Sequence, residues 1–130
     1  MEQLDFAARL RSVRERAPLV QCITNFVTVN DCANIILAAG GSPTMSHDVR
    51  EVEEAVAGVQ ALVCNLGAIG DLEAMLLAGK RANALGIPVV EIYAQPAILA
   101  ALPEDFQAAY AAELRPLHLR MRPDWLDETL

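Results

Sequence analysis

Three short apolar runs within residues 1–93 have the length and composition of β-strands. They cover residues 19–25, 61–66 and 87–93 and are rich in valine, leucine and isoleucine. Short apolar runs bounded by glycine, proline and polar residues favour strands, because helices need roughly ten residues or more. The run at 61–66 is almost continuously apolar, as expected of a strand that is covered on both faces.

Longer stretches with apolar residues at helical spacing separate these runs. We expect helices at about residues 4–16, 28–39, 48–58 and 71–86. Thr28 and Asn30 are alternative caps for the second helix, and Asp48 with Glu51 resembles a capping box for the third. The third helix repeats valine on one side, which predicts this buried stripe: Val49, Val52, Val56 and Val59.

Strands that alternate with helices predict a parallel α/β sheet with right-handed crossovers, flanked by helices in three layers. Residues 42–45 follow a helix stop at Gly40-Gly41 and are expected to form a loop. Ligands of such sheets gather outside the carboxyl ends of the strands, where Asn25 and Met45 would lie. An amide that donates and accepts, beside a thioether that fills apolar space, suits a small ring with heteroatoms.

The last forty residues have a different character. Residues 103–114 have a helical pattern, residues 117–122 alternate like a half-buried or edge strand, and residues 123–130 form an acidic tail. Upstream, Gly67-Ala68-Ile69-Gly70 is a weak candidate for a phosphate loop, because the lysine and hydroxyl residue of a P-loop are missing.

The length, composition and net charge of the chain narrow the class of protein. The 130 residues are 54% hydrophobic and 21% charged, which describes one globular unit with a real core. A net charge of −7 argues against nucleic acid as the main partner. No apolar run reaches the ~20 residues of a membrane span. The N-terminus lacks the features of a signal peptide, so we expect a cytoplasmic protein with no membrane partner.

The cysteines and histidines predict no metal site. Cys22, Cys32 and Cys64 have no CxxC spacing, and His47 and His118 have no partner at ligand spacing. We interpret the three cysteines as free thiols that pack in the core.

Three segments of the chain carry a resemblance to a known family. They are residues 23–25, ITN, residues 27–34, VTVNDCAN, and residues 42–45, SPTM. Together they closely resemble the N-terminal signature of hydroxyethylthiazole kinase, a thiamine-salvage enzyme of the ribokinase-like superfamily. The likeness continues more loosely through residues 58–67 and 73–80 and ends near Val90.

The resemblance implies a function and a site. It implies ATP-dependent phosphorylation of the primary alcohol of 4-methyl-5-(2-hydroxyethyl)thiazole, with ATP and Mg²⁺ as cofactors. It places Met45 in the thiazole pocket with Asn25 and Val27, and it makes Asn65 and Gly67 weaker candidates for substrate binding. Family enzymes form trimers with thiazole sites between subunits, so the resemblance also implies a homo-oligomer.

The resemblance stops before the family's catalytic half. Residues 91–130 contain neither the Gly-Thr-Gly catalytic turn nor the Arg-Gly-Asn segment that the family uses near the nucleotide. We therefore divide the chain into a family-like part, residues 1–90, and an unrecognised part, residues 91–130. We expect an incomplete ribokinase-like fold without kinase activity of its own, which a truncated gene, a frame change or a gene fusion would explain.

Two other readings of the chain are possible. The first is a non-catalytic α/β binding or regulatory module, similar in length to a receiver domain. A receiver needs clustered acidic residues at its strand ends, whereas Asn25, Asn65 and Glu91 occupy the ends here. The second is a non-functional product that folds partially.

Overall fold

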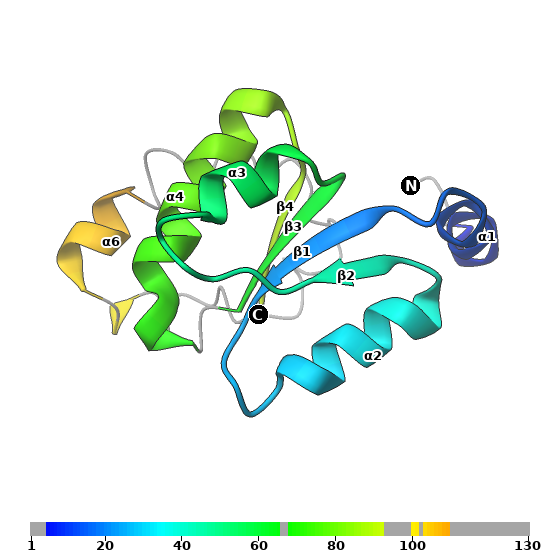
Figure 1. Cartoon of the computed structure of the whole chain (residues 1–130), viewed down its shortest axis with the longest axis horizontal. Coiled ribbons are helices and arrows are strands. Elements are labelled where there is room, and N and C mark those ends of the chain that lie inside the picture. The colour runs from blue at the N-terminus through cyan, green and yellow to red at the C-terminus, as the bar shows by residue number, and fades with distance from the viewer. Residues whose placement is uncertain (1–4, 66–67, 93–99, 102, 110–130) are drawn as a thin grey trace.

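The computed structural model describes residues 5–65, 68–92, 100–101 and 103–109 of the chain (Figure 1). Its elements, in chain order, are α1 (Phe6–Arg16), β1 (Leu19–Ile23), α2 (Val29–Ala39), β2 (Ser42–Thr44), α3 (Val52–Ala57), β3 (Ala61–Asn65), the 3₁₀ turn η1 (Ile69–Asp71), α4 (Leu72–Leu85), β4 (Val89–Ile92) and α6 (Glu104–Ala109). None of the described helices is long and apolar enough to cross a membrane.

The four described strands form one parallel sheet in the order β2-β1-β3-β4. β1 is therefore central, and the chain runs first to one side of it, into β2, and then to the other side, into β3 and β4. In register, Val20 of β1 lies opposite both Pro43 of β2 and Ala61 of β3. Right-handed crossovers then require α2 on one face of the sheet and both α3 and α4 on the other, as Figure 1 shows.

The hydrophobic core lies between the sheet and the layer of α3 and α4. Ile23, Leu62 and Val89, from three neighbouring strands, are fully buried there. They pack with the inward faces of the two helices, which include Val52, Val56, Met75, Ala78 and Ala82. Successive residues of a strand point to opposite faces, and residues paired across the sheet share a face. The need to bury these apolar side chains on one face therefore fixes the register of the strands.

The opposite face of the sheet is covered less completely. α2 contacts β1 and β2, yet no residue of α2 is fully buried. Over the other two strands, Val63 is half-buried and Val90 is 43% exposed. Within the described residues, this face is therefore closed at β1 and β2 and partly open at β3 and β4.

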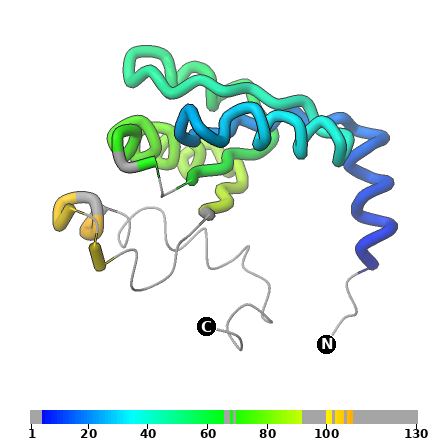
Figure 2. Tube along the Cα trace, turned by 90° about the horizontal axis from the view of Figure 1, so that it is seen from below, coloured from blue at the N-terminus to red at the C-terminus, as the bar shows by residue number. Residues whose placement is uncertain are grey.

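Two helices end at a glycine in the left-handed conformation. Gly40 has φ 100° after α2, and Gly86 has φ 69° after α4. A Cβ at Gly40 would lie 2.5 Å from Cγ and 2.9 Å from Cα of Arg14, whereas a Cβ at Gly86 would meet no atom within 4 Å. Gly40 thus lets α2 end directly against α1, the helix that projects at one end of the molecule (Figure 2).

The structure corrects the expectations for residues 42–52. Residues 42–44 form the edge strand β2 rather than a loop. The third helix begins at Val52 rather than at residue 48, and the expected capping box is not formed, because Glu51 accepts a hydrogen bond from Ser46 instead. Val49 lies in the turn before this helix and is 42% exposed, so it is not part of the buried valine stripe.

The other expected elements agree with the structure where it describes them. α1, β1, α2, β3, α4 and β4 lie within or near the predicted ranges, and α6 begins where the helix 103–114 was expected. The predicted strand at 117–122 and the acidic tail at 123–130 lie outside the described residues, as do residues 110–114.

Candidate functional site

The carboxyl ends of β1, β2 and β3 meet at the point where the strand order reverses. The connection from β1 leads to β2 on one side, while β3 lies on the other side. In open α/β sheets such a reversal leaves a crevice that ligands occupy. Asn25 follows β1, Met45 follows β2 and Asn65 ends β3, so three of the predicted site residues lie at this reversal point.

A continuous set of side-chain hydrogen bonds joins β3 to the turn after β1. Asn65 Nδ2 donates to Thr24 Oγ1 at 2.9 Å, and Thr24 Oγ1 lies 2.8 Å from Thr28 Oγ1. Thr28 Oγ1 donates to Asn25 Oδ1 at 2.9 Å. We call these four residues the turn network: Asn65, Thr24, Thr28 and Asn25.

The backbone fixes the orientation of the Asn25 amide. The Thr28 backbone N–H donates to Asn25 Oδ1 at 3.1 Å, so the oxygen rather than the nitrogen of this side chain faces the turn. Thr28 holds the cap position of α2, but its hydroxyl makes no capping hydrogen bond and serves the turn network instead. Of the two alternative caps, Thr28 therefore occupies the cap position, but its side chain does not make the expected capping hydrogen bond.

Met45 lies on a loop that is tied to the neighbouring strand. Gln21 is fully buried in β1, and its Nε2 donates to the backbone oxygen of Ser46 at 2.8 Å. The rings of Phe26 and His47 meet edge to face with centroids 5.4 Å apart. The loop that carries Met45 therefore contacts both β1 and the turn that carries Asn25.

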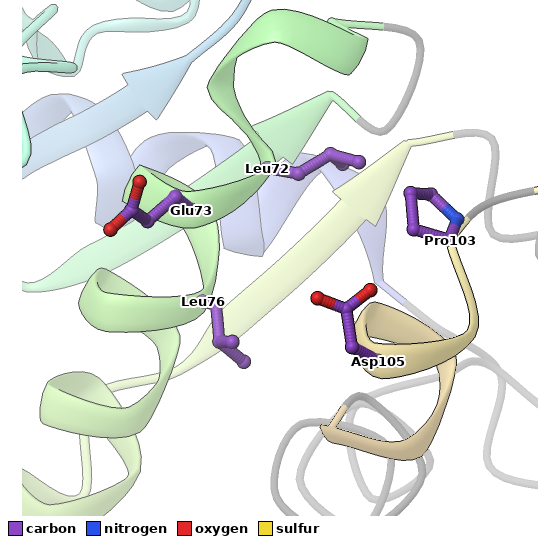
Figure 3. A pocket seen from close by; sticks show the side chains of 5 residues that line it. All are labelled: Leu72, Glu73, Leu76, Pro103 and Asp105. Atoms are coloured by element: carbon purple, nitrogen blue, oxygen red, sulfur yellow. The ribbon is translucent and has the colours of Figure 1, made fainter.

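The remaining predicted site residues have different positions. Val27 is 88% exposed on the turn between β1 and α2. Gly67 lies outside the described residues. None of the four predicted site residues that the structure describes lines the cavity of about 340 Å³ between α4 and α6, where Leu72 and Leu76 lie opposite Pro103 and Asp105 (Figure 3).

Burial and charge set the pKa of three groups around the sheet. Burial raises the pKa of the Cys22 thiol to about 12 and raises that of Cys64 well above its ordinary value. Hydrogen bonds from the Arg50 side chain hold the pKa of the Asp48 carboxyl well below its usual range. Cys22 and Cys64 are therefore neutral core thiols, as the sequence predicted, whereas the half-buried Cys32 is not part of the buried core.

The part of the chain that the structure describes does not fit a nucleotide–metal centre. It holds no group of three or more histidine, cysteine, aspartate or glutamate residues placed to bind one metal ion. Of the charged side chains beside the Met45 loop, Asp48 and Arg50 are paired with each other, and Glu51 accepts a hydrogen bond from Ser46. The reversal point instead offers amides, hydroxyls and apolar groups, which suit an uncharged organic ligand.

Comparison with known proteins identifies the family. The model of the hydroxyethylthiazole kinase family matches residues 10–100. The chain belongs to this family. It is 59% identical over 87 residues to a hydroxyethylthiazole kinase of Desulfovibrio desulfuricans, and the matched segment is 65% of this chain and 30% of that relative. A relative with the same name from Alkaliphilus oremlandii is 53% identical over 83 residues, which are 62% of this chain and 31% of the relative.

A solved structure agrees with the fold of this family. The hydroxyethylthiazole kinase protein from Pyrococcus horikoshii superposes with a TM-score of 0.64 and 40% sequence identity, over 72% of this chain and 39% of that one. The four parallel strands and their helices are thus an incomplete ribokinase-like α/β fold. The chain spans about 30% of the length of the curated hydroxyethylthiazole kinases that it matches.

Sequence reasoning missed three residues that shape the reversal point and the Met45 loop beside it. Thr24 was assigned only to the end of the first strand, Thr28 only to a helix cap, and Gln21 only to an apolar run. A glutamine in the middle of a strand with no charged neighbours was the one signal available for Gln21, because a buried amide needs a partner.

Proposed function

We propose that this chain forms the thiazole-binding wall of a hydroxyethylthiazole kinase site, with 4-methyl-5-(2-hydroxyethyl)thiazole as its ligand. The turn network at the sheet's reversal point carries the proposal, because it holds Asn25 and Asn65 in fixed positions beside the Met45 loop. Met45 and Val27 supply apolar contacts to the ring, and Asn25 supplies the polar one. Gly67, which follows β3 in the sequence, completes the set of proposed substrate residues.

The phosphoryl-transfer part of the reaction is a separate matter. In the proposed reaction, ATP is the phosphoryl donor and Mg²⁺ neutralises the charge of its phosphates. The described residues do not form a site for either of them, and the sequence lacks the Gly-Thr-Gly turn. We therefore expect the 130-residue chain to bind thiazole without phosphorylating it. Thiazole-dependent release of ADP by the purified chain would refute this expectation.

We also propose that the chain self-associates, as a trimer by family resemblance. Large apolar side chains are exposed beside the site on the turn after β1, Phe26 and Val27, and farther away in the later half of α2, Ile35 and Leu37. Burial of this surface against a second copy would place a neighbour next to Asn25. Light scattering should detect one discrete oligomer, and a monomer or a continuous series of aggregates would contradict the proposal.

Calorimetric titration with hydroxyethylthiazole tests the ligand assignment. Met45→Asp should weaken binding by more than about tenfold, because it places a charge against an apolar ring. Val49→Asp is the matched control: it adds the same charge to the connection between β2 and α3, at a side chain that is already exposed. Equal affinity of wild type and Met45→Asp would show that the pocket lies elsewhere.

The comparisons do not favour the alternative of a regulatory α/β module, since the relatives are named as kinases. The cytoplasmic location and the absence of nucleic-acid and membrane partners stay predictions, as does the division of the chain at residue 90.

A further inference from the structure

The turn network has one direction in which all its protons can be placed. Asn25 Oδ1 can only accept, so the 2.9 Å contact with Thr28 Oγ1 uses the single hydroxyl proton of Thr28. The proton in the 2.8 Å contact between the two hydroxyls must then come from Thr24. Thr24 in turn accepts from Asn65 Nδ2. Every bond therefore points the same way, from Asn65 through Thr24 and Thr28 to Asn25.

This direction decides what Asn25 can offer to a ligand. Its Oδ1 accepts from both the backbone N–H and the hydroxyl of Thr28, at 3.1 Å and 2.9 Å. A carbonyl oxygen has two lone pairs, so its accepting capacity is used within the turn. The Nδ2 group, with two protons, is the part of this half-buried side chain that remains for the crevice.

We propose that Thr24, Thr28 and Asn65 are positioning residues that hold Asn25 as a hydrogen-bond donor, so that the site selects a ligand with an acceptor atom at this point. The inference deepens the proposed function and rests on it for the identity of the ligand. Hydroxyethylthiazole carries two such acceptors, the ring nitrogen and the hydroxyl oxygen. A ligand group that can only donate would face the protons of Nδ2 and bind poorly.

The first test needs no ligand. In the free protein, the side-chain amide signal of Asn25 is followed by ¹⁵N NMR in Thr28→Val, Thr28→Ser and Thr44→Val. Thr28→Val should shift this signal because it removes one donor to Oδ1, whereas Thr28→Ser should restore it. Thr44→Val makes the same change on β2, outside the turn network, and should leave the signal in place. A wild-type signal in Thr28→Val would overturn the proposal.

A second variant tests the direction itself. Asn65→Asp keeps the shape of the side chain but can only accept when ionised, so Thr24 must donate to it and no longer to Thr28. The Asn25 amide signal should then move although residue 65 makes no contact with Asn25 in the turn network. An unchanged Asn25 signal in a folded Asn65→Asp protein would show that the bonds are not ordered in one direction.

Calorimetry tests whether the turn network affects ligand binding. Thr28→Val should weaken binding of hydroxyethylthiazole by about three- to tenfold, Thr28→Ser by less, and Asn25→Asp by more than about tenfold, since its second oxygen repels an acceptor. The analogue 5-ethyl-4-methylthiazole lacks the hydroxyl oxygen. If Asn25→Asp weakens the analogue as much as the parent ligand, the ring nitrogen is the acceptor; if only the parent is affected, the hydroxyl oxygen is.

The two proposals fail in different ways. If the wild-type chain does not bind hydroxyethylthiazole while the amide signals respond as expected, the proposed function is rejected and the orientation of Asn25 stands. If wild type binds and Asn25→Asp binds equally well, Asn25 is not the donor and the inference is rejected.

Discussion

Replacing the two left-handed glycines by alanine should have unequal costs, although both end a helix. Gly86→Ala meets only the backbone penalty of about 1–2 kcal/mol for a left-handed L-residue, since its Cβ would contact nothing within 4 Å. Gly40→Ala adds a collision with Arg14 at 2.5 Å and 2.9 Å, and overpacking of this kind costs about 1–3 kcal/mol. We therefore expect losses of about 1–2 kcal/mol for Gly86→Ala and about 2–5 kcal/mol for Gly40→Ala.

Urea unfolding measures the loss of stability in each variant. The loss expected for Gly40→Ala is a large part of the usual free energy of unfolding of about 5–15 kcal/mol. The double variant Arg14→Ala with Gly40→Ala removes the Cγ atom but keeps Cα at 2.9 Å and Cβ at 3.2 Å, so it should recover only part of the loss. If the two single variants differ by less than about 0.5 kcal/mol, α1 does not pack against the end of α2 as described.

Three further predictions concern the core and the titrating groups. Met75→Ala should cost about 2–5 kcal/mol in urea unfolding, because its side chain is fully buried, while Leu85→Ala on the exposed side of α4 should cost about 0.5 kcal/mol. Burial raises the pKa of Cys22 to about 12, so its contribution to stability should be full below the ordinary thiol pKa of about 8.5 and fall as the pH rises toward 12. Cys22→Ala should make this alkaline decline shallower, and an equal decline in wild type and variant would contradict the role of Cys22. Arg50→Gln should return the lowered pKa of Asp48 toward about 3.9, so the stability that this pair adds above that pH, and loses in acid, should disappear; carboxyl NMR titration checks it.

Much of the fold was predictable because its strands are short apolar runs and its helices have amphipathic periodicity. The start of α3 was not, because Asp48 accepts from the backbone N–H of Arg50 in a local turn that competes with the helix. β2 was missed because a run of three residues that includes Pro43 has no periodicity to detect. Proline is tolerated there because β2 lies at the edge of the described sheet, where its missing N–H breaks no ladder bond.

The site was only partly predictable. Strand ends could be located from the sequence, so Asn25, Met45 and Asn65 were named as candidates. The turn network could not, because Thr24 and Asn65 are separated by 41 residues and their contact depends on the register between β1 and β3. Resemblance to a family implied a ligand but not the direction in which Asn25 presents its protons.

The central position of β1 has a consequence for the order in which the chain folds. β1 precedes its neighbour β3 in the chain, and α2, β2 and α3 lie between them. The pairing of β1 with β2 closes a shorter loop, and shorter loops close at a lower entropic cost, so we expect it to precede the pairing of β1 with β3. Asn65 reaches Thr24 only in that later step. The turn network is therefore complete only in the finished sheet, and an intermediate with only the first two strands paired would have the local bonds from Thr28 to Asn25 without the bond from Asn65 to Thr24.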